Sequence, residues 1–247
     1  MKQETATKLI DLNRQFNQTF AGPFSATRQR LQPGVRRVAG DLLHMPVLLD
    51  LGCGNGELAL HLIQMGFRGY YLGVDFSPGL ITAARDKLSG RSNVVFELVD
   101  LTSPDWDDNV QYLLEKHNVD QPGAVLAFAV LHHIPGETLR LTLLNKVKRL
   151  IRPGGMFLHS VWQFQNSPRL SKRVQPWSLA SLAEAEVDPG DYLLDWRHAG
   201  TGLRYVHQFN EPELSKLADQ AGFSINNTFY SDGDGGRLGL YQLWLSE

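Results

Sequence analysis

Residues 47–57 are Val47-Leu48-Leu49-Asp50-Leu51-Gly52-Cys53-Gly54-Asn55-Gly56-Glu57. The run before the first glycine is short, apolar and bounded by glycines, which predicts a buried parallel strand with Asp50 near its end. Three glycines at alternate positions let the backbone turn tightly and let a ligand approach it closely. A helix that begins near Glu57 points its N-terminal amide groups at the same place. The stretch therefore predicts a strand, a turn and a helix that bind a nucleotide-like cofactor.

The spacing of the glycines indicates which kind of cofactor binds. Dinucleotide-binding turns have the spacing G-x-G-x-x-G, and their helix N-terminus faces a pyrophosphate. Here the spacing is G-x-G-x-G and Glu57 follows at once, so a carboxylate would repel a diphosphate. The turn suits a cofactor with a cationic centre and no phosphate. The pattern from Asp50 to Gly56 resembles motif I of the class I S-adenosylmethionine-dependent methyltransferases.

Further apolar runs also end in polar residues. The run 70–74 ends in Asp75, at the tip of the second strand, where a carboxylate can accept both ribose hydroxyls. The run 94–99 ends in Asp100, and the resemblance implies that this residue holds the adenine amino group. The donor is then S-adenosylmethionine and the product S-adenosylhomocysteine. The predicted cofactor site comprises Arg28, Asp50, Gly52, Gly54, Gly56, Asp75, Phe76, Asp100, Leu101 and Ala129.

Strands alternate with helices over most of the chain, which predicts a parallel sheet. We expect helices near residues 57–65, 78–88, 106–117 and 137–151, and a fifth strand after the turn at 152–155. A helix capped by Asn210 precedes strands near 223–230 and 238–245. The fold class is therefore α/β and Rossmann-like, a mostly parallel seven-stranded sheet with helices on both faces and a C-terminal antiparallel hairpin.

Two regions stand apart from this alternation. Residues 1–45 form a helical N-terminal arm, with one helix that Gly22-Pro23 should end and another that starts after Pro33. Residues 46–247 form the methyltransferase domain. Within it, the residues 163–206 are rich in Pro, Ser and Trp and are expected to be an insert on the substrate side. Its tryptophans either stack on a base or pack in a core.

Composition excludes several classes of protein. The 43% hydrophobic and 20% charged residues are ordinary for a globular domain. No apolar run approaches the 18 or so residues of a membrane span, and residues 1–5 lack the apolar core of a secretory signal. Cys53 is the only cysteine, so no internal disulfide can form, and no Cys/His spacing indicates a metal site. We expect a cytoplasmic protein without a membrane partner or a metal ion.

Segments outside the core indicate the acceptor. Residues 16–28, 190–196 and 204–214 resemble, in order, segments of the tRNA wobble-uridine carboxymethyl methyltransferases. The resemblance implies methylation of the carboxylate of 5-carboxymethyluridine in tRNA to its methyl ester, and a small zinc-binding activator subunit as a partner. After Arg28 the sequence departs from that family, whose usual Lys-Pro-Trp-like stretch is here Gln29-Arg30-Leu31. A small-molecule O- or N-methyltransferase of the same fold is the alternative.

The arm differs in charge from the rest of the chain. Residues 1–46 hold seven basic and three acidic residues, a net charge of +4, whereas the whole chain carries −2. This arm either presents a phosphate-binding face or is a solvated helix surface.

A carboxylate acceptor also fits particular side chains. It is ionised at pH 7, so the enzyme needs mainly to orient and desolvate it, and arginine binds it with two parallel hydrogen bonds. Arg28 and Arg204 are the candidates for this role, and Arg28 can instead hold the methionyl carboxylate of the cofactor. Either His132 or His133 is expected to face the methyl group as an orienting residue or a base. Arg204, Tyr205 and His207 form the predicted substrate-binding set, in which Tyr205 and His207 either contact the uracil or pack in the core.

Overall fold

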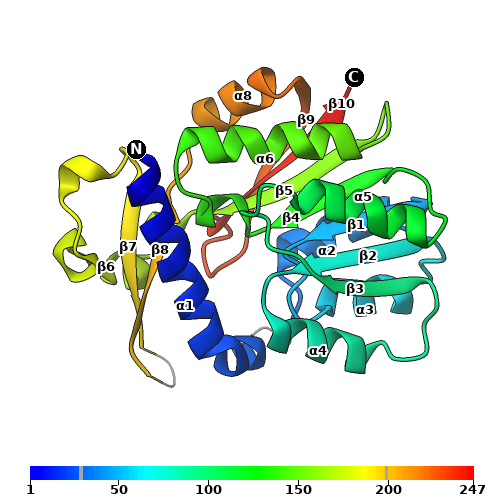
Figure 1. Ribbon diagram of the computed structural model, residues 1–247, viewed down its shortest axis with the longest axis horizontal. Helices are drawn as coiled ribbons and strands as arrows, with labels where there is room; N and C mark the ends of the chain where they lie inside the picture. Colours follow the sequence, from blue (N-terminus) through cyan, green and yellow to red (C-terminus); the bar gives the residue numbers. More distant parts are fainter. Residues whose placement is uncertain (28–29, 198–199) are drawn as a thin grey trace.

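A seven-stranded sheet forms the centre of the molecule in the computed structural model (Figure 1), which describes residues 1–27, 30–197 and 200–247, and their side chains except at 21 and 23–27. The strand order is β3-β2-β1-β4-β5-β10-β9, and β10 runs in the opposite direction to the other six strands. The strands are β1 (Val47–Leu51), β2 (Tyr70–Asp75), β3 (Val94–Leu98), β4 (Ala124–Phe128), β5 (Met156–Trp162), β9 (Phe223–Ser231) and β10 (Gly239–Ser246).

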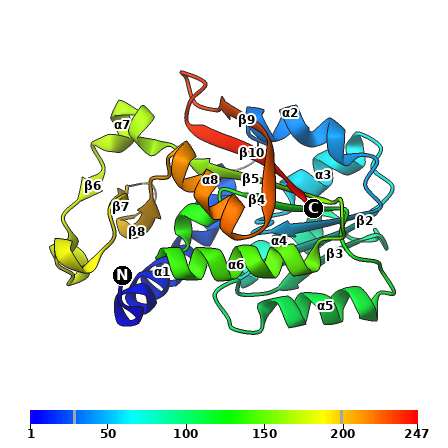
Figure 2. The ribbon, with the colours of Figure 1, turned by 90° about the horizontal axis from the view of Figure 1, so that it is seen from above.

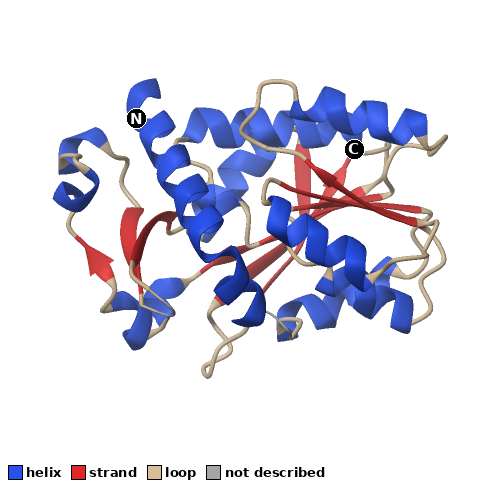
Figure 3. Ribbon diagram, turned by 60° about the horizontal axis from the view of Figure 1, so that its bottom comes forward, coloured by secondary structure: helices blue, strands red, loops and turns tan. Residues whose placement is uncertain are grey.

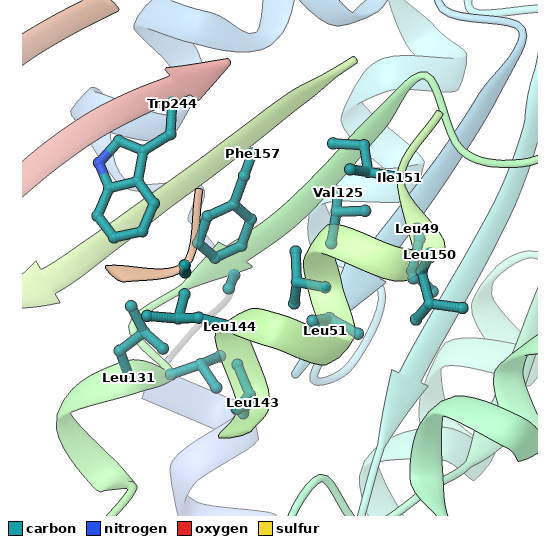
Figure 4. Packing of buried hydrophobic residues seen from close by; sticks show 14 of the residues in the cluster. Leu49, Leu51, Val125, Leu131, Leu143, Leu144, Leu150, Ile151, Phe157 and Trp244 are labelled. Atoms are coloured by element: carbon teal, nitrogen blue, oxygen red, sulfur yellow. The ribbon is translucent and has the colours of Figure 1, made fainter. Parts of the chain in front are cut away.

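Helices cover both faces of this sheet, as Figure 2 shows. One face carries α2 (Pro33–Leu42), α3 (Glu57–Gln64) and α4 (Pro78–Lys87), and the other carries α5 (Trp106–Lys116), α6 (Glu137–Leu150) and α8 (Glu211–Gln220). Strand β1 shows why both layers are needed: Leu48 packs toward α2 and α3, whereas Leu49 and Leu51 pack toward α5 and α6. Figure 4 shows this second core, in which Leu144 lies near Phe157.

The insert forms a second, three-stranded antiparallel sheet, which the sequence did not predict. Its strands are β6 (Val174–Gln175), β7 (Asp191–Trp196) and β8 (Gly202–His207), so β8 extends one residue past the predicted boundary at 206. The short helix α7 (Pro168–Ser171) and the 3-10 turns η2 (Phe164–Asn166), η3 (Trp177–Ala180) and η4 (Glu184–Glu186) complete it, and η1 (Leu131–His133) follows β4.

Helix α1 (Gln3–Thr27) lies between the two sheets (Figures 1 and 3). Leu9 packs against Leu193 and Tyr205 of the small sheet, and Phe16 and Phe20 pack against Trp196. These contacts bury the apolar stripe of α1. They therefore stabilise the helix, because an amphipathic helix is stabilised mainly by the packing of its apolar stripe.

The predicted fold class is confirmed, and one local prediction was wrong. The bounds of the four core helices lie within about one residue of those predicted, and α2 begins at Pro33, one residue before its predicted start. Gly22-Pro23, however, does not end the first helix, which continues to Thr27. Proline removes one helical N–H donor and often bends a helix, but it does not oblige the helix to stop. In the part of the chain that the structure describes, no helix is long and apolar enough to cross a membrane.

Candidate active site

A cavity of about 530 Å³ opens at the carboxyl ends of β1, β2, β3 and β4 and extends to α1 and β8. This is the edge of an open α/β sheet at which ligands bind. The lining includes most of the predicted site residues. They are Asp50, Gly52, Gly54, Asp75, Phe76, Asp100, Leu101, Ala129, His132, His133 and Arg204.

The glycine turn adopts a backbone that only glycine accommodates easily. Gly52, Gly54 and Gly56 have φ angles of 74°, 57° and 74°. A Cβ atom on Gly52 would lie 2.6 Å from Cγ2 of Val130, so the turn has no room for a side chain there. Gly56 is the N-cap of α3 and does not line the cavity; it packs against α4 instead. The turn thus brings backbone atoms of two of its glycines to the cavity.

Asp50 is fully buried at the start of this turn. The Tyr71 hydroxyl donates a hydrogen bond to its Oδ2 atom. Burial raises the pKa of Asp50 to about 7, the hydrogen bond from Tyr71 partly offsets this, and the nearby Asp75 charge adds to it. Asp50 therefore titrates near neutral pH, which makes it sensitive to any positive charge placed in the cavity.

Asp75 is held in a fixed orientation at the end of β2. Its Oδ2 atom accepts from the Gly54 amide at 3.0 Å, and its Oδ1 atom accepts from the Ser77 amide at 2.9 Å. It lines the cavity at the end of the second parallel strand, where a carboxylate binds the ribose hydroxyls in nucleotide-binding sheets. Asp75 therefore fits a ribose diol, and the residues here fit the adenosyl part of S-adenosylmethionine.

Asp100 has more protein partners than the sequence indicated. Thr102 donates to its Oδ1 atom from both the amide and the hydroxyl, and Arg14 of α1 donates to Oδ2 from Nε (3.0 Å) and Nη2 (2.6 Å). Burial alone would raise the pKa of Asp100, but these bonds outweigh it and hold the pKa below its ordinary value. All four lone-pair positions accept protein donors, so an adenine amino group would have to replace one of them. The predicted adenine role of Asp100 stays a prediction.

Glu57 also lines the cavity, at the start of α3. Its carboxylate pairs with Lys87 of α4 at 2.6 Å. Lys87 therefore neutralises part of the negative charge of Glu57. The sequence argument against a diphosphate cofactor relied on that charge, so this ion pair weakens it.

The two histidines of η1 present opposite tautomers. Nδ1 of His132 accepts from the Trp162 amide at 3.3 Å, so neutral His132 carries its proton on Nε2. Nδ1 of His133 faces the Tyr205 carbonyl at 3.2 Å, and because a carbonyl only accepts, neutral His133 carries its proton on Nδ1. One ring is therefore a donor at Nε2 and the other an acceptor at Nε2.

Arg204 lies among aromatic rings in the same cavity. Its guanidinium carbon is 4.5 Å from the ring centroid of Trp162, 5.5 Å from Phe16 and 5.7 Å from Trp196. Only 5% of the residue is exposed. Aromatic rings contact the flat faces of a guanidinium, whereas a carboxylate binds along its N–H edge, so the two kinds of contact are compatible.

Tyr205 and His207 do not line this cavity. Both are buried in a polar network: Asp191 accepts hydrogen bonds from the Tyr205 hydroxyl and from Nδ1 of His207, each at 2.7 Å. Nε2 of His207 lies 2.8 Å from Glu213, and Arg140 donates to the Tyr205 hydroxyl at 2.9 Å. Burial alone would lower the pKa of His207, but the two carboxylates outweigh it and raise the pKa above its ordinary value. The arrangement joins β7 and β8 to α6 and α8.

Asn13 is a site residue that the sequence reasoning missed. Its side-chain amide nitrogen donates to the carbonyls of His133 (3.3 Å) and Tyr205 (3.2 Å), and its oxygen accepts from the Tyr205 amide at 2.8 Å. A detectable signal exists, because Asn13 interrupts the apolar stripe of α1 between Leu9 and Phe16. Arg28, the other predicted arginine, lies outside the described residues. Among those described, no group of three or more His, Cys, Asp or Glu is placed to hold a metal ion.

Known proteins match the chain in both sequence and fold. A family model described as a methyltransferase domain matches residues 49–157. The tRNA (carboxymethyluridine(34)-5-O)-methyltransferase of Arabidopsis thaliana is 30% identical over 193 residues, which cover 78% of this chain and 43% of the relative. The enzyme of the same name from Schizosaccharomyces pombe is 26% identical over 219 residues, covering 82% and 84%. The chain thus spans less than half the length of the plant relative.

Solved structures agree with the topology. The Burkholderia thailandensis 1,6-didemethyltoxoflavin-N1-methyltransferase, solved with 1,6-didemethyltoxoflavin and S-adenosylhomocysteine, superposes with a TM-score of 0.61 at 19% identity. The alignment covers 98% of this chain and 89% of that one. At this identity the likeness establishes the fold. Together with the family match and the glycine turn, it identifies the donor as S-adenosylmethionine. The chain therefore belongs to the class I S-adenosylmethionine-dependent methyltransferases.

Proposed function

We propose that this methyltransferase acts on tRNA and converts the carboxylate of 5-carboxymethyluridine to its methyl ester. The observation that carries the proposal is Arg204, a buried cation among three aromatic rings that lines the same cavity as Asp75 and the two histidines. An arginine in an aromatic setting suits an acceptor that combines a flat base with a carboxylate. The relatives named as tRNA carboxymethyluridine methyltransferases support the same acceptor.

The reaction asks little of the protein beyond binding and orientation. S-adenosylmethionine supplies an electrophilic methyl group on a sulfonium. Asp75 would hold its ribose, and Asp100 the adenine in exchange for one of its present protein donors, while Arg204 aligns the acceptor carboxylate for in-line attack. The carboxylate is already ionised at pH 7 and needs no strong base. Arg28 stays a candidate for either the acceptor or the methionyl carboxylate.

The tautomer of His132 suits a carboxylate acceptor, whereas Nε2 of His133 is the base that a hydroxyl acceptor would use. Neutral His132 has an Nε2–H that can donate to a carboxylate oxygen, whereas a hydroxyl acceptor would need a base to remove its proton. We assign His132 as the histidine that orients the acceptor. His133 would then accept from a donor on the base or the ribose through Nε2.

A methyl ester has a chemical property that tests this proposal directly. The full chain is incubated with tritiated S-adenosylmethionine and either bulk tRNA or a metabolite extract. We expect label on tRNA that mild alkali releases as volatile methanol, because esters hydrolyse in base and N-methyl or ribose-methyl groups do not. Alkali-stable label would contradict the carboxylate, and label found only in metabolites would favour the small-molecule alternative.

Matched variants of Arg204 separate acceptor binding from donor binding. Arg204→Lys keeps the charge but loses the two-pronged geometry, so we expect tRNA turnover to fall at least tenfold while S-adenosylmethionine affinity stays within about twofold. Arg91→Gln, an exposed arginine outside the cavity, is the control. If donor affinity fell more than turnover, Arg204 would belong to the donor site.

Two further features of the proposal rest on the family resemblance. A small zinc-binding activator subunit and a cytoplasmic location stay predictions. Turnover measured with and without such a subunit tests the first, and fractionation of cells tests the second.

A further inference from the structure

Seven basic side chains gather around the mouth of the cavity, and we call them the basic rim. Arg30 and Arg169 line the cavity itself. The others lie beside them on α2, after α7 and in the loop between β9 and β10. The rim comprises Arg30, Arg36, Arg37, Arg169, Lys172, Arg173 and Arg237.

These three segments are adjacent in space although they are distant in sequence. The β9–β10 loop connects the other two: the Asn166 side chain donates to the Arg237 carbonyl at 2.9 Å, and the Gly34 amide of α2 donates to Asp232 at 2.8 Å. Figure 2 shows α7, the β9–β10 hairpin and α2 along one side of the molecule. The segments that carry the rim are therefore neighbours in the fold.

The charge of the rim is not neutralised by the protein. Six of the seven side chains are exposed, and none of the seven forms an ion pair with a described residue. Exposed cations elsewhere, such as Arg85 and Lys216, pair with Glu97 and Glu137. Asp232 and Asp234, two carboxylates of the same loop, lower the local charge of the seven cations only in part.

Aromatic contacts hold two of the rim arginines over the protein surface. The guanidinium carbon of Arg37 lies 4.1 Å from the ring centroid of Phe229, and that of Arg237 lies 4.3 Å from Tyr230. A guanidinium that stacks on a ring still points its N–H edge toward solvent, where an anion can bind. Because the ring already restricts the side chain, it loses little conformational entropy when the anion binds. The whole chain carries a net charge of −2, so this cationic surface is local.

We propose that the basic rim binds the phosphates of the nucleotides that flank the methylated uridine. This inference rests on the proposed function, because it takes tRNA as the acceptor. A base that reaches Arg204 must leave its backbone at the mouth, where Arg30 and Arg169 lie. Arginine, which makes up six of the seven residues, binds phosphate oxygens in pairs. The rim thus selects for a polynucleotide acceptor, whereas Arg204 selects for the carboxylate.

Salt dependence of tRNA binding tests the rim with a matched control. The rim variant carries Arg169→Gln, Lys172→Gln and Arg237→Gln. The control carries Arg68→Gln, Arg91→Gln and Arg152→Gln, three exposed arginines before β2, β3 and β5, and hence at the opposite edge of the sheet. Both variants remove three charges. Binding of bulk tRNA is measured by filter retention from about 50 to 200 mM salt.

If the rim binds phosphates, the slope of log K against log salt becomes shallower by about 2 to 3 in the rim variant, since each lost phosphate contact contributes about 0.7–0.9. The control slope should not change. Melting temperature and S-adenosylhomocysteine affinity, measured on the same samples, report on folding. Equal slopes for the two variants would overturn the inference, as would binding of the wild-type chain to anionic vesicles but not to tRNA. The alkali-release assay on wild-type chain tests the proposed function separately.

Discussion

Replacing Asp50 by asparagine should change how stability depends on pH. Asp50 is the fully buried carboxylate at the start of the glycine turn. Burial raises its pKa from 3.8 to about 7, against the opposing hydrogen bond from Tyr71. The folded chain therefore holds the Asp50 proton more tightly than the unfolded chain does. It follows that the stabilisation linked to this proton is complete below about pH 3.8 and is lost as the pH rises to about 7.

The size of the effect follows from these two pKa values. A difference of about 3 pKa units between the folded and unfolded chain corresponds to at most about 4 kcal/mol of the free energy of unfolding. Of this stabilisation, about 2–3 kcal/mol is lost between pH 5 and pH 8. Asparagine has a similar shape and no charge at any pH. The free energy of unfolding of Asp50→Asn, minus that of the wild type, should therefore rise by about 2–3 kcal/mol from pH 5 to pH 8.

Urea unfolding at pH 5, 6, 7 and 8 measures this difference. Other titrating groups are shared by both proteins, so their contributions largely cancel. Asp234→Asn, at an exposed loop carboxylate, is the control and should show a constant difference from the wild type. A constant difference for Asp50→Asn as well would refute the argument, because it would mean that Asp50 ionises in the folded chain at its ordinary pKa.

The structure also predicts the effects of three other substitutions. Asp75→Ala should weaken S-adenosylmethionine binding by about 1.5–3 kcal/mol in calorimetry, through the loss of charged hydrogen bonds, and an unaltered affinity would remove Asp75 from the donor site. Gly52→Ala should destabilise the fold by at least about 1–2 kcal/mol in urea, because alanine disfavours the φ of 74° and its Cβ would meet Val130; a neutral result would mean that the turn can rearrange. Asn13→Leu should lower the free energy of unfolding in urea by about 1–3 kcal/mol for each Tyr205 backbone group, amide or carbonyl, that it leaves without a partner. A variant as stable as the wild type would show that water replaces the Asn13 amide.

The fold could be predicted because its determinants are local. Each core strand is an apolar run bounded by a turn, each core helix has its own apolar period, and Asn210 caps α8. The carboxylates at the ends of β1, β2 and β3 follow from the same pattern, since the ends of parallel strands share one edge. Strands β7 and β8 escaped prediction because neither is a continuous apolar run and neither has a regular alternation of buried and exposed residues.

The acceptor side of the cavity depends on contacts that no local pattern contains. Asn13 and Tyr205 are 192 residues apart, and Arg14 and Asp100 are 86 apart. The sequence placed Tyr205 and His207 in the substrate set because they lie in one segment with Arg204. Residues of a strand alternate between its faces, however, so Tyr205 points away from the face that Arg204 presents. His207, two residues further along β8, lies on the same face as Tyr205, and both side chains bond to Asp191.

Helix α1 connects the donor and acceptor sides through consecutive residues. Arg14 contacts Asp100 at the end of β3, and Asn13 contacts Tyr205 and the η1 turn that carries His133. Neighbouring residues of a helix point about 100° apart, so one turn can reach two walls of the same cavity. A displacement of α1 would therefore move a donor-side contact and an acceptor-side contact together. The parallel sheet supplies the donor site, and we expect the choice of acceptor to depend on α1 and the insert, whose positions the sheet does not determine.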